Sequence, residues 1–309
     1  MQILFHAPDA NPAPWLAELQ AALPQAQLRV WQEGDTAPAD FAIVWKPPAA
    51  MLQRRTDLKG IFNLGAGVDA ILQLGEALPA GVPIVRLDDA GMGVQMAEYV
   101  THGVLRYYRK FDQLDAQQKA GQWRFVKAHD KENFSVGILG LGVLGSRIAA
   151  ALTPFGFPLH GWSRTQKTLA GVTCHAGADA LPTFLAASRV VVCVLPLTGD
   201  TEGILNRANL SAMPAGAYLI NVARGAHLVE EDLLSLVQEG HIAGATLDVF
   251  RQEPLPPAHP FWQEPRITIT PHIAAVTLRA DSVRQIVAKI NRLQQGQDVP
   301  GVVERARGY

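Results

Sequence analysis

Short apolar runs alternate with amphipathic stretches along the N-terminal third of the chain. Apolar runs bounded by proline, glycine or polar residues are typical of buried strands, whereas Trp15–Leu23 has apolar residues at helical spacing and is closed by Pro24. Because strands that alternate with helices form parallel sheets, this order predicts βα units. The predicted strands are Ile3–His6, Leu28–Trp31, Phe41–Trp45, Ile61–Leu64 and Ile84-Val85.

A longer amphipathic segment, Val94–Phe111, predicts a helix that crosses into a second domain. Strands and helices alternate again after it, so a second parallel sheet is expected. The amphipathic helix Ser282–Gln295 would then fold back onto the first domain. The other predicted elements are the strands Ser135–Leu139, Leu159–Trp162, Val190–Leu195, Ala217–Asn221, Gly244–Val249 and Ile267–Thr270, and the helices Val143–Leu152 and Glu231–Glu239.

The composition supports a globular protein with a sizeable core. Hydrophobic residues make up 48% of the 309 residues and charged residues 18%, and this length suits two domains. The formal net charge is -1 and no run of lysine or arginine stands out. A nucleic-acid partner normally requires a basic face, so that class of protein is set aside.

The cysteines and the N-terminus indicate a reducing, cytoplasmic location. Neither Cys174 nor Cys193 has the spacing of a metal site, and Cys193 lies in an apolar run where a buried, inert thiol is expected. The N-terminus lacks the basic and apolar regions of a signal peptide. No apolar stretch approaches the roughly 18–20 residues that a membrane span requires. We therefore expect no metal site, no membrane contact and a cytoplasmic protein.

A glycine-rich turn follows one of the middle strands. Gly140, Gly142 and Gly145 form a G-x-G-x-x-G pattern between a predicted strand and a predicted helix, which is the setting of a dinucleotide site. Gly140 permits the tight turn, Gly142 lets a pyrophosphate approach the backbone, and Gly145 lets helix and strand pack closely. The anion would then meet free N–H groups at the helix N-terminus. The alternative is a loop that only turns tightly, and the flanking elements disfavour it.

The segment after the next strand, Leu159–Trp162, indicates which dinucleotide is bound. Enzymes that use NAD usually place an acid there to bind the ribose 2′-hydroxyl, but no acid is present in this segment. A planar arginine fork can hold a 2′-phosphate instead, so NADPH is the preferred cofactor and NADH the second possibility. The alternative is a solvated basic turn. The hydroxyls and cations offered here are those of Ser163, Arg164, Thr165 and Lys167.

Three polar residues follow later predicted strands and form the candidate reacting group. Arg224 comes after an apolar strand and before a glycine, so it can project into the crevice at the carboxyl edge of the sheet and grip a carboxylate. His272 can donate a proton near neutral pH, and Glu253 beside it would stabilise the protonated imidazole. Each residue also has a structural alternative, since an arginine can cap a strand and a histidine after proline is often structural. His6, His102, His160 and His175 have no comparable neighbours and are expected to be structural.

These motifs together resemble the D-isomer-specific 2-hydroxyacid dehydrogenases, and the resemblance covers nearly all of the chain. Within that family, the chain resembles the bacterial reductases of glyoxylate and hydroxypyruvate. The residues that carry the family resemblance are Leu64–Asp69, the glycine turn, Asn221–Gly225, Leu247–Leu255 and Thr270–His272; those of the subgroup are Val44–Pro48, Trp162–Thr165 and Arg305–Tyr309.

The resemblance implies a role for each site residue. Arg224 would orient the substrate, His272 would be the acid and base, and Glu253 would tune His272. Asp248 would hold the nicotinamide carboxamide, and Trp45 would restrict substrate size. The full cofactor set is Gly140, Gly142, Val143, Leu144, Gly145, Ser163, Arg164, Thr165, Lys167, Leu195, Pro196, Thr201, Val222, Ala223 and Asp248, and the full substrate set is Trp45, Leu64, Gly65, Ala66, Gly67, Arg224 and His272.

The resemblance also implies an α/β architecture of two Rossmann-like domains with parallel sheets. Residues 1–95 and 275–309 would form the substrate domain, and residues 96–274 an inserted cofactor domain, with the active site in the cleft between them. A homodimer is expected, for which Val94–Phe111 and Trp123–Phe125 are candidate contacts. The expected activity is NADPH-dependent reduction of small 2-keto acids. Three alternatives stay open: a dinucleotide-sensing binding protein, a 3-phosphoglycerate dehydrogenase, and a reductase of aromatic or branched 2-keto acids.

Overall fold

The computed structural model describes all 309 residues, which divide into two units. The first unit consists of two separate segments, Met1–Met92 and Thr277–Tyr309, and the second is the continuous segment Gly93–Val276. Each unit contains one parallel sheet with helices, so the predicted α/β class with two parallel sheets is confirmed.

The first unit is built on a five-stranded parallel sheet in the order β2-β1-β3-β4-β5. The central strands β3 and β4 are buried along their whole length, as expected for a parallel sheet covered on both faces. An ion pair of 2.6 Å between Arg279 and Glu18 joins α10 to α1. The strands are β1 (Gln2–His6), β2 (Gln27–Val30), β3 (Phe41–Val44), β4 (Gly60–Asn63) and β5 (Ile84–Val85), and the helices are α1 (Pro12–Ala22), α2 (Ala49–Leu52), α3 (Asp69–Leu72) and α10 (Arg279–Gln294).

The second unit is built on a seven-stranded parallel sheet in the order β12-β11-β10-β9-β6-β7-β8. Counted from β6, this is the doubly wound order of a dinucleotide-binding fold with one strand added, and the strand order reverses between β6 and β9. The strands are β6 (Val136–Leu139), β7 (Leu159–Ser163), β8 (Val172–Ala176), β9 (Val190–Cys193), β10 (Ala217–Asn221), β11 (Ile242–Leu247) and β12 (Ile267–Ile269).

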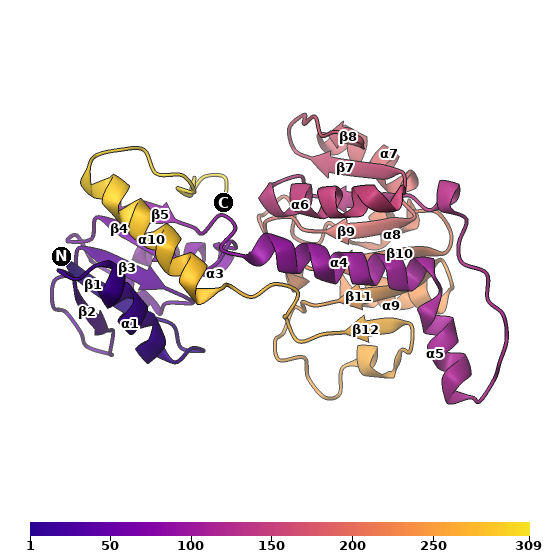
Figure 1. Ribbon diagram of the computed structural model, residues 1–309, viewed down its shortest axis with the longest axis horizontal. Coiled ribbons are helices and arrows are strands. Elements are labelled where there is room, and N and C mark those ends of the chain that lie inside the picture. Colours follow the sequence, from indigo (N-terminus) through magenta and orange to yellow (C-terminus); the bar gives the residue numbers. More distant parts are fainter. The chain divides into compact units, whose positions relative to one another are not determined.

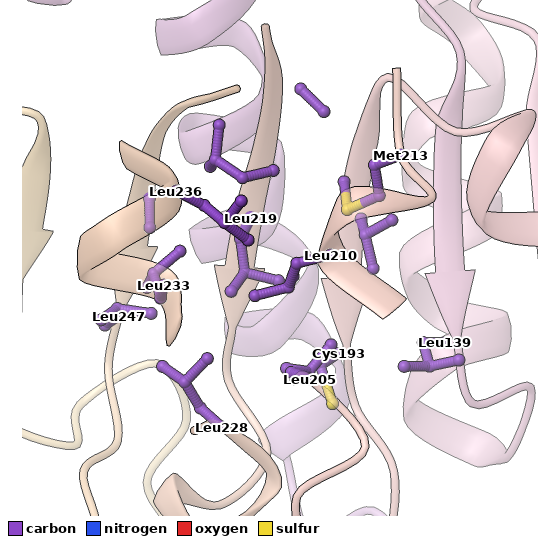
Figure 2. Close-up of a cluster of buried hydrophobic side chains, with 14 of the residues drawn as sticks. Leu139, Cys193, Leu205, Leu210, Met213, Leu219, Leu228, Leu233, Leu236 and Leu247 are labelled. Carbon is purple, nitrogen blue, oxygen red and sulfur yellow. The ribbon is translucent and has the colours of Figure 1, made fainter. Parts of the chain in front are cut away.

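Helices cover both faces of this sheet, because its strands are apolar on both sides. Val190 and Val192 pack with α4 and α6 on one face, which Figure 1 shows in front of the strands. Val191 and Cys193 point to the other face, where leucines of α8 and α9 pack against Leu219 (Figure 2). The helices are α4 (Met92–Tyr108), α5 (Phe111–Lys119), α6 (Val143–Leu152), α7 (Leu181–Ala186), α8 (Arg207–Ser211) and α9 (Glu230–Gln238).

Short 3-10 helices complete the chain. They are η1 (Gly75–Ala77), η2 (Lys131–Asn133), η3 (Thr153–Phe155), η4 (Ala178–Ala180), η5 (Gly225–His227) and η6 (Pro260–Gln263).

Several elements of the structure differ from the prediction. The helix expected over Val94–Phe111 ends at Tyr108, and a separate helix starts at Phe111, because Lys110 adopts a left-handed backbone conformation with φ 59°. Strand β8 and the short helices α2, α3, α7 and α8 were not predicted; β8 is a half-buried edge strand whose sequence, VTCHA, lacks an apolar run. The remaining predicted helices and strands are present, with ends that differ by a few residues.

The thiol of Cys193 is fully buried, and burial raises its pKa to about 12, so the prediction of an inert cysteine is confirmed. None of the helices combines the length and the apolar character that crossing a lipid bilayer would demand.

Candidate active site

The predicted cofactor and reacting residues of the second unit follow strands of one parallel sheet. The glycine turn follows β6, Leu195 follows β9, Arg224 follows β10, Glu253 follows β11 and His272 follows β12. Since parallel strands end at the same edge of a sheet, these segments all start from its carboxyl edge. The order of strands from β6 to β12 therefore sets the order of the groups along that edge.

The glycine turn has the geometry of a phosphate cradle. Gly140 has φ 118°, a left-handed conformation that a side chain would strain. A Cβ on Gly145 would lie 1.8 Å from the carbonyl oxygen of Gly140, so only glycine permits this packing of α6 on β6. By contrast, a Cβ on Gly142 would meet no atom within 4 Å. The open space at Gly142, together with the N-terminus of α6 at Val143, fits a pyrophosphate.

The turn after β7 presents its cations to solvent. Ser163, at the end of β7, is buried, and its hydroxyl donates to the carbonyl oxygen of Thr165 over 2.8 Å. Arg164, Thr165 and Lys167 are exposed. Two cations and no carboxylate therefore stand at the position where the ribose 2′ substituent of a dinucleotide would be expected.

Arg224 is held by close packing of the backbone around it. A Cβ on the following Gly225 would lie 1.9 Å from the carbonyl carbon of Phe250, so the Arg224 turn packs directly on the loop after β11. The amide of Asn221 accepts from the Ala223 N–H over 3.2 Å and donates to the Arg224 carbonyl over 3.2 Å. Asn221 is fully buried, so it fixes this turn from inside the sheet.

Glu253 and His272 form a direct pair. The Nδ1 of His272 lies 2.8 Å from a carboxylate oxygen of Glu253, and the other carboxylate oxygen accepts the Phe250 N–H over 3.0 Å. Burial alone would raise the pKa of Glu253, whereas the hydrogen bonds from His272 and Phe250 lower it. The charges of His272 and Arg224 lower the pKa further, so the net shift is downward. The structure thus brings His272 and Glu253 into contact and places Arg224 where its charge acts on the same carboxylate.

The loop that carries His272 is anchored by Asp248. His272 has φ 56°, a left-handed conformation that costs about 1–2 kcal/mol for a residue with a side chain. Its N–H donates to the Asp248 carbonyl over 2.9 Å, while the Asp248 carboxylate accepts the N–H groups of Ile273 and Ala274 at 2.8 Å each. These bonds hold the strained loop in place. Asp248 is only 1% exposed, and its expected contact with a nicotinamide carboxamide stays a prediction.

Two polar residues behind this loop were not identified from the sequence. Thr270 donates to the Asp248 carboxylate over 2.6 Å, and the hydroxyl of Tyr99 lies 2.5 Å from the Thr270 hydroxyl. Burial raises the pKa of Tyr99 to about 12, so the phenol keeps its proton. Thr270 lies in the motif around His272, but nothing local in the sequence connects it with Tyr99, 171 residues away.

The remaining cofactor residues lie in the loops after β9 and β10. Thr201 donates to the Pro196 carbonyl over 2.7 Å, which closes the loop that follows Leu195. The fully buried His227 contacts the same carbonyl at 3.2 Å and accepts the Arg224 N–H through Nδ1 at 3.2 Å. His227 therefore links the β9 loop to the Arg224 turn, a role that the sequence did not indicate. Val222 and Ala223, which were expected to bind cofactor, are buried.

The predicted substrate residues of the first unit gather at the ends of β3 and β4. The ring of Trp45 lies against Gly65, where a Cβ would be 2.6 Å from the ring. The buried amide of Asn63 donates to the carbonyl oxygens of Gly65 and Gly67, over 3.0 and 2.9 Å. The Leu64 N–H donates to the Val44 carbonyl over 2.8 Å, so the donors that this loop can offer a ligand are the N–H groups of Gly65–Gly67. Lys46 places its ammonium 5.9 Å from the centre of the Trp45 ring.

Two histidines that were expected to be structural contact each other. His160 and His175 face each other across β7 and β8 with ring nitrogens 3.3 Å apart. Burial and then the charge of His175 lower the pKa of His160. The structure holds no group of three or more histidine, cysteine, aspartate or glutamate side chains arranged to bind a metal ion.

Comparison with known families gives a match over most of the second unit. Residues 101–274 match the family model described as the NAD binding domain of D-isomer-specific 2-hydroxyacid dehydrogenases. The chain is also 50% identical to glyoxylate/hydroxypyruvate reductase A of Yersinia enterocolitica, over 100% of both chains. The predicted resemblance to this family is therefore confirmed.

Two solved structures are similar over the full length of the chain. One, from Xanthobacter autotrophicus, is a D-isomer-specific 2-hydroxyacid dehydrogenase in complex with NADPH and MES; it is 41% identical, with a TM-score of 0.95, and the match covers 100% of this chain and 99% of that one. The other, from Sinorhizobium meliloti, is an NADPH-dependent glyoxylate/hydroxypyruvate reductase in complex with NADP and sulfate. It is 34% identical, with a TM-score of 0.93, and the match covers 100% of both chains.

Proposed function

Because the chain belongs to the D-isomer-specific 2-hydroxyacid dehydrogenase family, we propose that it reduces glyoxylate and hydroxypyruvate to glycolate and D-glycerate with NADPH. The membership makes it an NAD(P)-dependent 2-hydroxyacid dehydrogenase. The observation that supports the finer proposal most is the Glu253–His272 pair, 2.8 Å apart, on the sheet edge that also carries Arg224 and the phosphate cradle.

The cradle residues fit a dinucleotide, as the open space at Gly142 and the exposed Arg164 indicate. Bound NADPH would supply the hydride, and the protein must supply a proton and hold the ketone. His272 uses Nδ1 for Glu253, so Nε2 is the nitrogen left to donate a proton to the developing alkoxide. Glu253 keeps a negative charge beside the imidazole, since its pKa is lowered, and that charge stabilises the protonated ring.

Arg224 would bind the substrate carboxylate and polarise the neighbouring keto oxygen through its planar fork. In the first unit, the N–H groups of Gly65–Gly67 are available to bind a carboxylate, and Trp45 against Gly65 would limit the size of a substituent beside it. A bulky indole at this position would favour glyoxylate and hydroxypyruvate over aromatic 2-keto acids.

The preference for NADPH is supported by charge. Arg164 and Lys167 can pair with a 2′-phosphate, and no carboxylate in the Ser163–Lys167 turn would repel it. The similar structures from X. autotrophicus and S. meliloti contain NADPH and NADP. A preference of tenfold or more for NADH in kcat/KM would contradict this part of the proposal.

We also propose that the protein acts as a homodimer. Trp123 and Phe125, in the segment after α5, are 101% and 92% exposed. Large apolar side chains at such exposure are expected to be covered by a partner, here a second copy of this chain. Sedimentation should give a dimer for the wild-type protein and a shift toward monomer for the double variant Trp123→Ser/Phe125→Ser. A monomeric wild-type protein would contradict this proposal.

The activity is tested by measuring loss of NADPH with glyoxylate, hydroxypyruvate, pyruvate and phenylpyruvate, each repeated with NADH. We expect the highest kcat/KM for glyoxylate or hydroxypyruvate with NADPH, and chiral chromatography should give D-glycerate from hydroxypyruvate. Turnover confined to phenylpyruvate would identify an aromatic 2-keto acid reductase. No turnover with any 2-keto acid, despite NADPH binding, would favour a dinucleotide-sensing protein.

A further inference from the structure

One face of α4 runs along the seven-stranded sheet and makes contacts at both the carboxyl and the amino ends of its strands. Gln95, Tyr99, Gly103 and Tyr107 recur every four residues and therefore share this face. A Cβ on Gly103 would lie 3.0 Å from the end of the Ile220 side chain, so the helix approaches β10 closely at this point. Because the helix lies this close, Gln95 and Tyr99 reach the carboxyl edge of the sheet and Tyr107 reaches its amino edge.

At the carboxyl edge, α4 holds both ends of the segment that carries His272. Tyr99 contacts Thr270, the first residue of the segment, at 2.5 Å. One turn earlier on the helix, Gln95 donates to the Val276 carbonyl over 2.9 Å and accepts the Val276 N–H over 3.3 Å. The segment Thr270–Val276 is thus held at its two ends by side chains of the same helix.

A chain of hydrogen bonds connects Tyr99 to the loop that carries His272. Thr270 has one hydroxyl proton and donates it to the Asp248 carboxylate over 2.6 Å, so its oxygen accepts from Tyr99. The same carboxylate accepts the N–H groups of Ile273 and Ala274, the two residues that follow His272. Loss of the Tyr99 hydroxyl would free Thr270 to rotate and would weaken the anchor of the left-handed turn.

We propose that Tyr99 and Gln95 are positioning residues for the reduction of 2-keto acids: from α4 they fix the Thr270–Val276 segment and thereby the place of the His272 imidazole. This proposal rests on the proposed function only for its kinetic readout. Neither residue touches the substrate in the proposed mechanism; they act through Thr270, Asp248 and the backbone of the loop. Small displacements of a proton donor lower the rate of the chemical step far more than they lower cofactor affinity.

The matched control lies on the same helix face at the opposite edge of the sheet. The Tyr107 hydroxyl donates to the Gly216 carbonyl, far along α4 from His272. Tyr99→Phe and Tyr107→Phe therefore each remove one part-buried tyrosine hydroxyl from α4 and should lower thermal stability to a similar extent. Only Tyr99→Phe should lower kcat, by about tenfold, with KM for NADPH within twofold of wild type. Gln95→Leu should act in the same direction with a smaller effect.

Two further readouts separate positioning from simple destabilisation. Thr270→Val should lower kcat at least as much as Tyr99→Phe, Thr270→Ser should restore most of it, and the double variant Tyr99→Phe/Thr270→Val should lose no more than Thr270→Val alone. Hydrogen exchange should be faster at the amides of Ile273 and Ala274 in Tyr99→Phe, but unchanged there in Tyr107→Phe.

Wild-type kcat in Tyr99→Phe, or an equal loss of kcat in Tyr107→Phe, would overturn the proposal. Unchanged exchange at Ile273 and Ala274 in Tyr99→Phe would overturn it independently of any activity. If the wild-type protein reduces no 2-keto acid, the proposed function fails, while the exchange measurement still decides whether Tyr99 anchors the segment.

Discussion

The loops at the carboxyl edge of the seven-stranded sheet differ between the two sides of β6 in how their polar residues are held. On one side, after β7, Arg164 and Lys167 are exposed. Their turn is held by the hydrogen bond from the Ser163 hydroxyl to the Thr165 carbonyl. On the other side, after β10 and β11, the supporting groups are buried: Asn221 fixes the Arg224 turn and Asp248 fixes the loop of His272, although Glu253 and His272 are themselves exposed.

This difference follows from what each side has to do. A 2′-phosphate is recognised mainly by its negative charge, so exposed cations in a surface turn can bind it. A proton donor must instead be held within about 0.5 Å of the productive position, which requires supporting hydrogen bonds in a buried setting. Substitutions on the β7 side should therefore change cofactor preference without changing stability, whereas substitutions on the β10–β12 side should change the chemical step.

The largest effect is expected for His272→Gln, which removes the proton donor. We expect kcat for glyoxylate reduction to fall by about 10²–10⁴-fold, because general acid catalysis contributes that much. The dissociation constant for NADPH, measured by fluorescence titration, should stay within twofold of wild type. His160→Gln on β7 is the control and should keep wild-type kcat; near-normal turnover in His272→Gln would remove His272 from its role.

Arg224→Lys comes next, since it keeps the positive charge but removes the planar fork. Loss of bidentate binding of the carboxylate should lower kcat/KM for glyoxylate by about 100-fold, with little change in NADPH affinity. Steady-state kinetics at saturating NADPH measure this effect. A variant with wild-type kcat/KM would show that the carboxylate is bound elsewhere.

On the exposed side, the double variant Arg164→Ala/Lys167→Ala should lower kcat/KM for NADPH by about 10- to 100-fold, the effect of losing charge-assisted hydrogen bonds to a phosphate. The value for NADH should change less than twofold and serves as the internal control. Thermal stability should not change, because both side chains are exposed. An equal loss of kcat/KM with both cofactors would show that the two cations do not act by binding the 2′-phosphate.

The smallest effect is expected for Glu253→Gln, which keeps the hydrogen bond to His272 but removes the negative charge. Reduction requires the protonated imidazole, which the neutral amide stabilises less. The basic limb of the kcat/KM profile should therefore move to lower pH. Since the pKa of Glu253 is lowered in the folded protein, the wild-type carboxylate stays charged throughout this range. An unmoved limb would argue against the pairing.

The parts of the molecule that could be predicted from sequence are those set by local pattern. The apolar strands and the glycines at 140, 142 and 145 can be interpreted from the few residues around each of them. The break at Lys110 could not be predicted, because no glycine or proline marks it, and β8 was missed because an edge strand needs no apolar run. The support of the site was also beyond reach of the sequence, since Tyr99 meets Thr270 only after the sheet has formed.

The central claim is that Arg224 and the Glu253–His272 pair converge on one ketone beside the nicotinamide. A crystal structure with NADP and oxamate, an unreactive 2-keto acid analogue, tests it most directly. We predict the pyrophosphate over Gly142, with the oxamate amide oxygen within about 2.6–3.2 Å of both the Arg224 guanidinium and the Nε2 of His272. Oxamate bound away from these two groups, or an imidazole turned away from it while NADP is in place, would contradict the account.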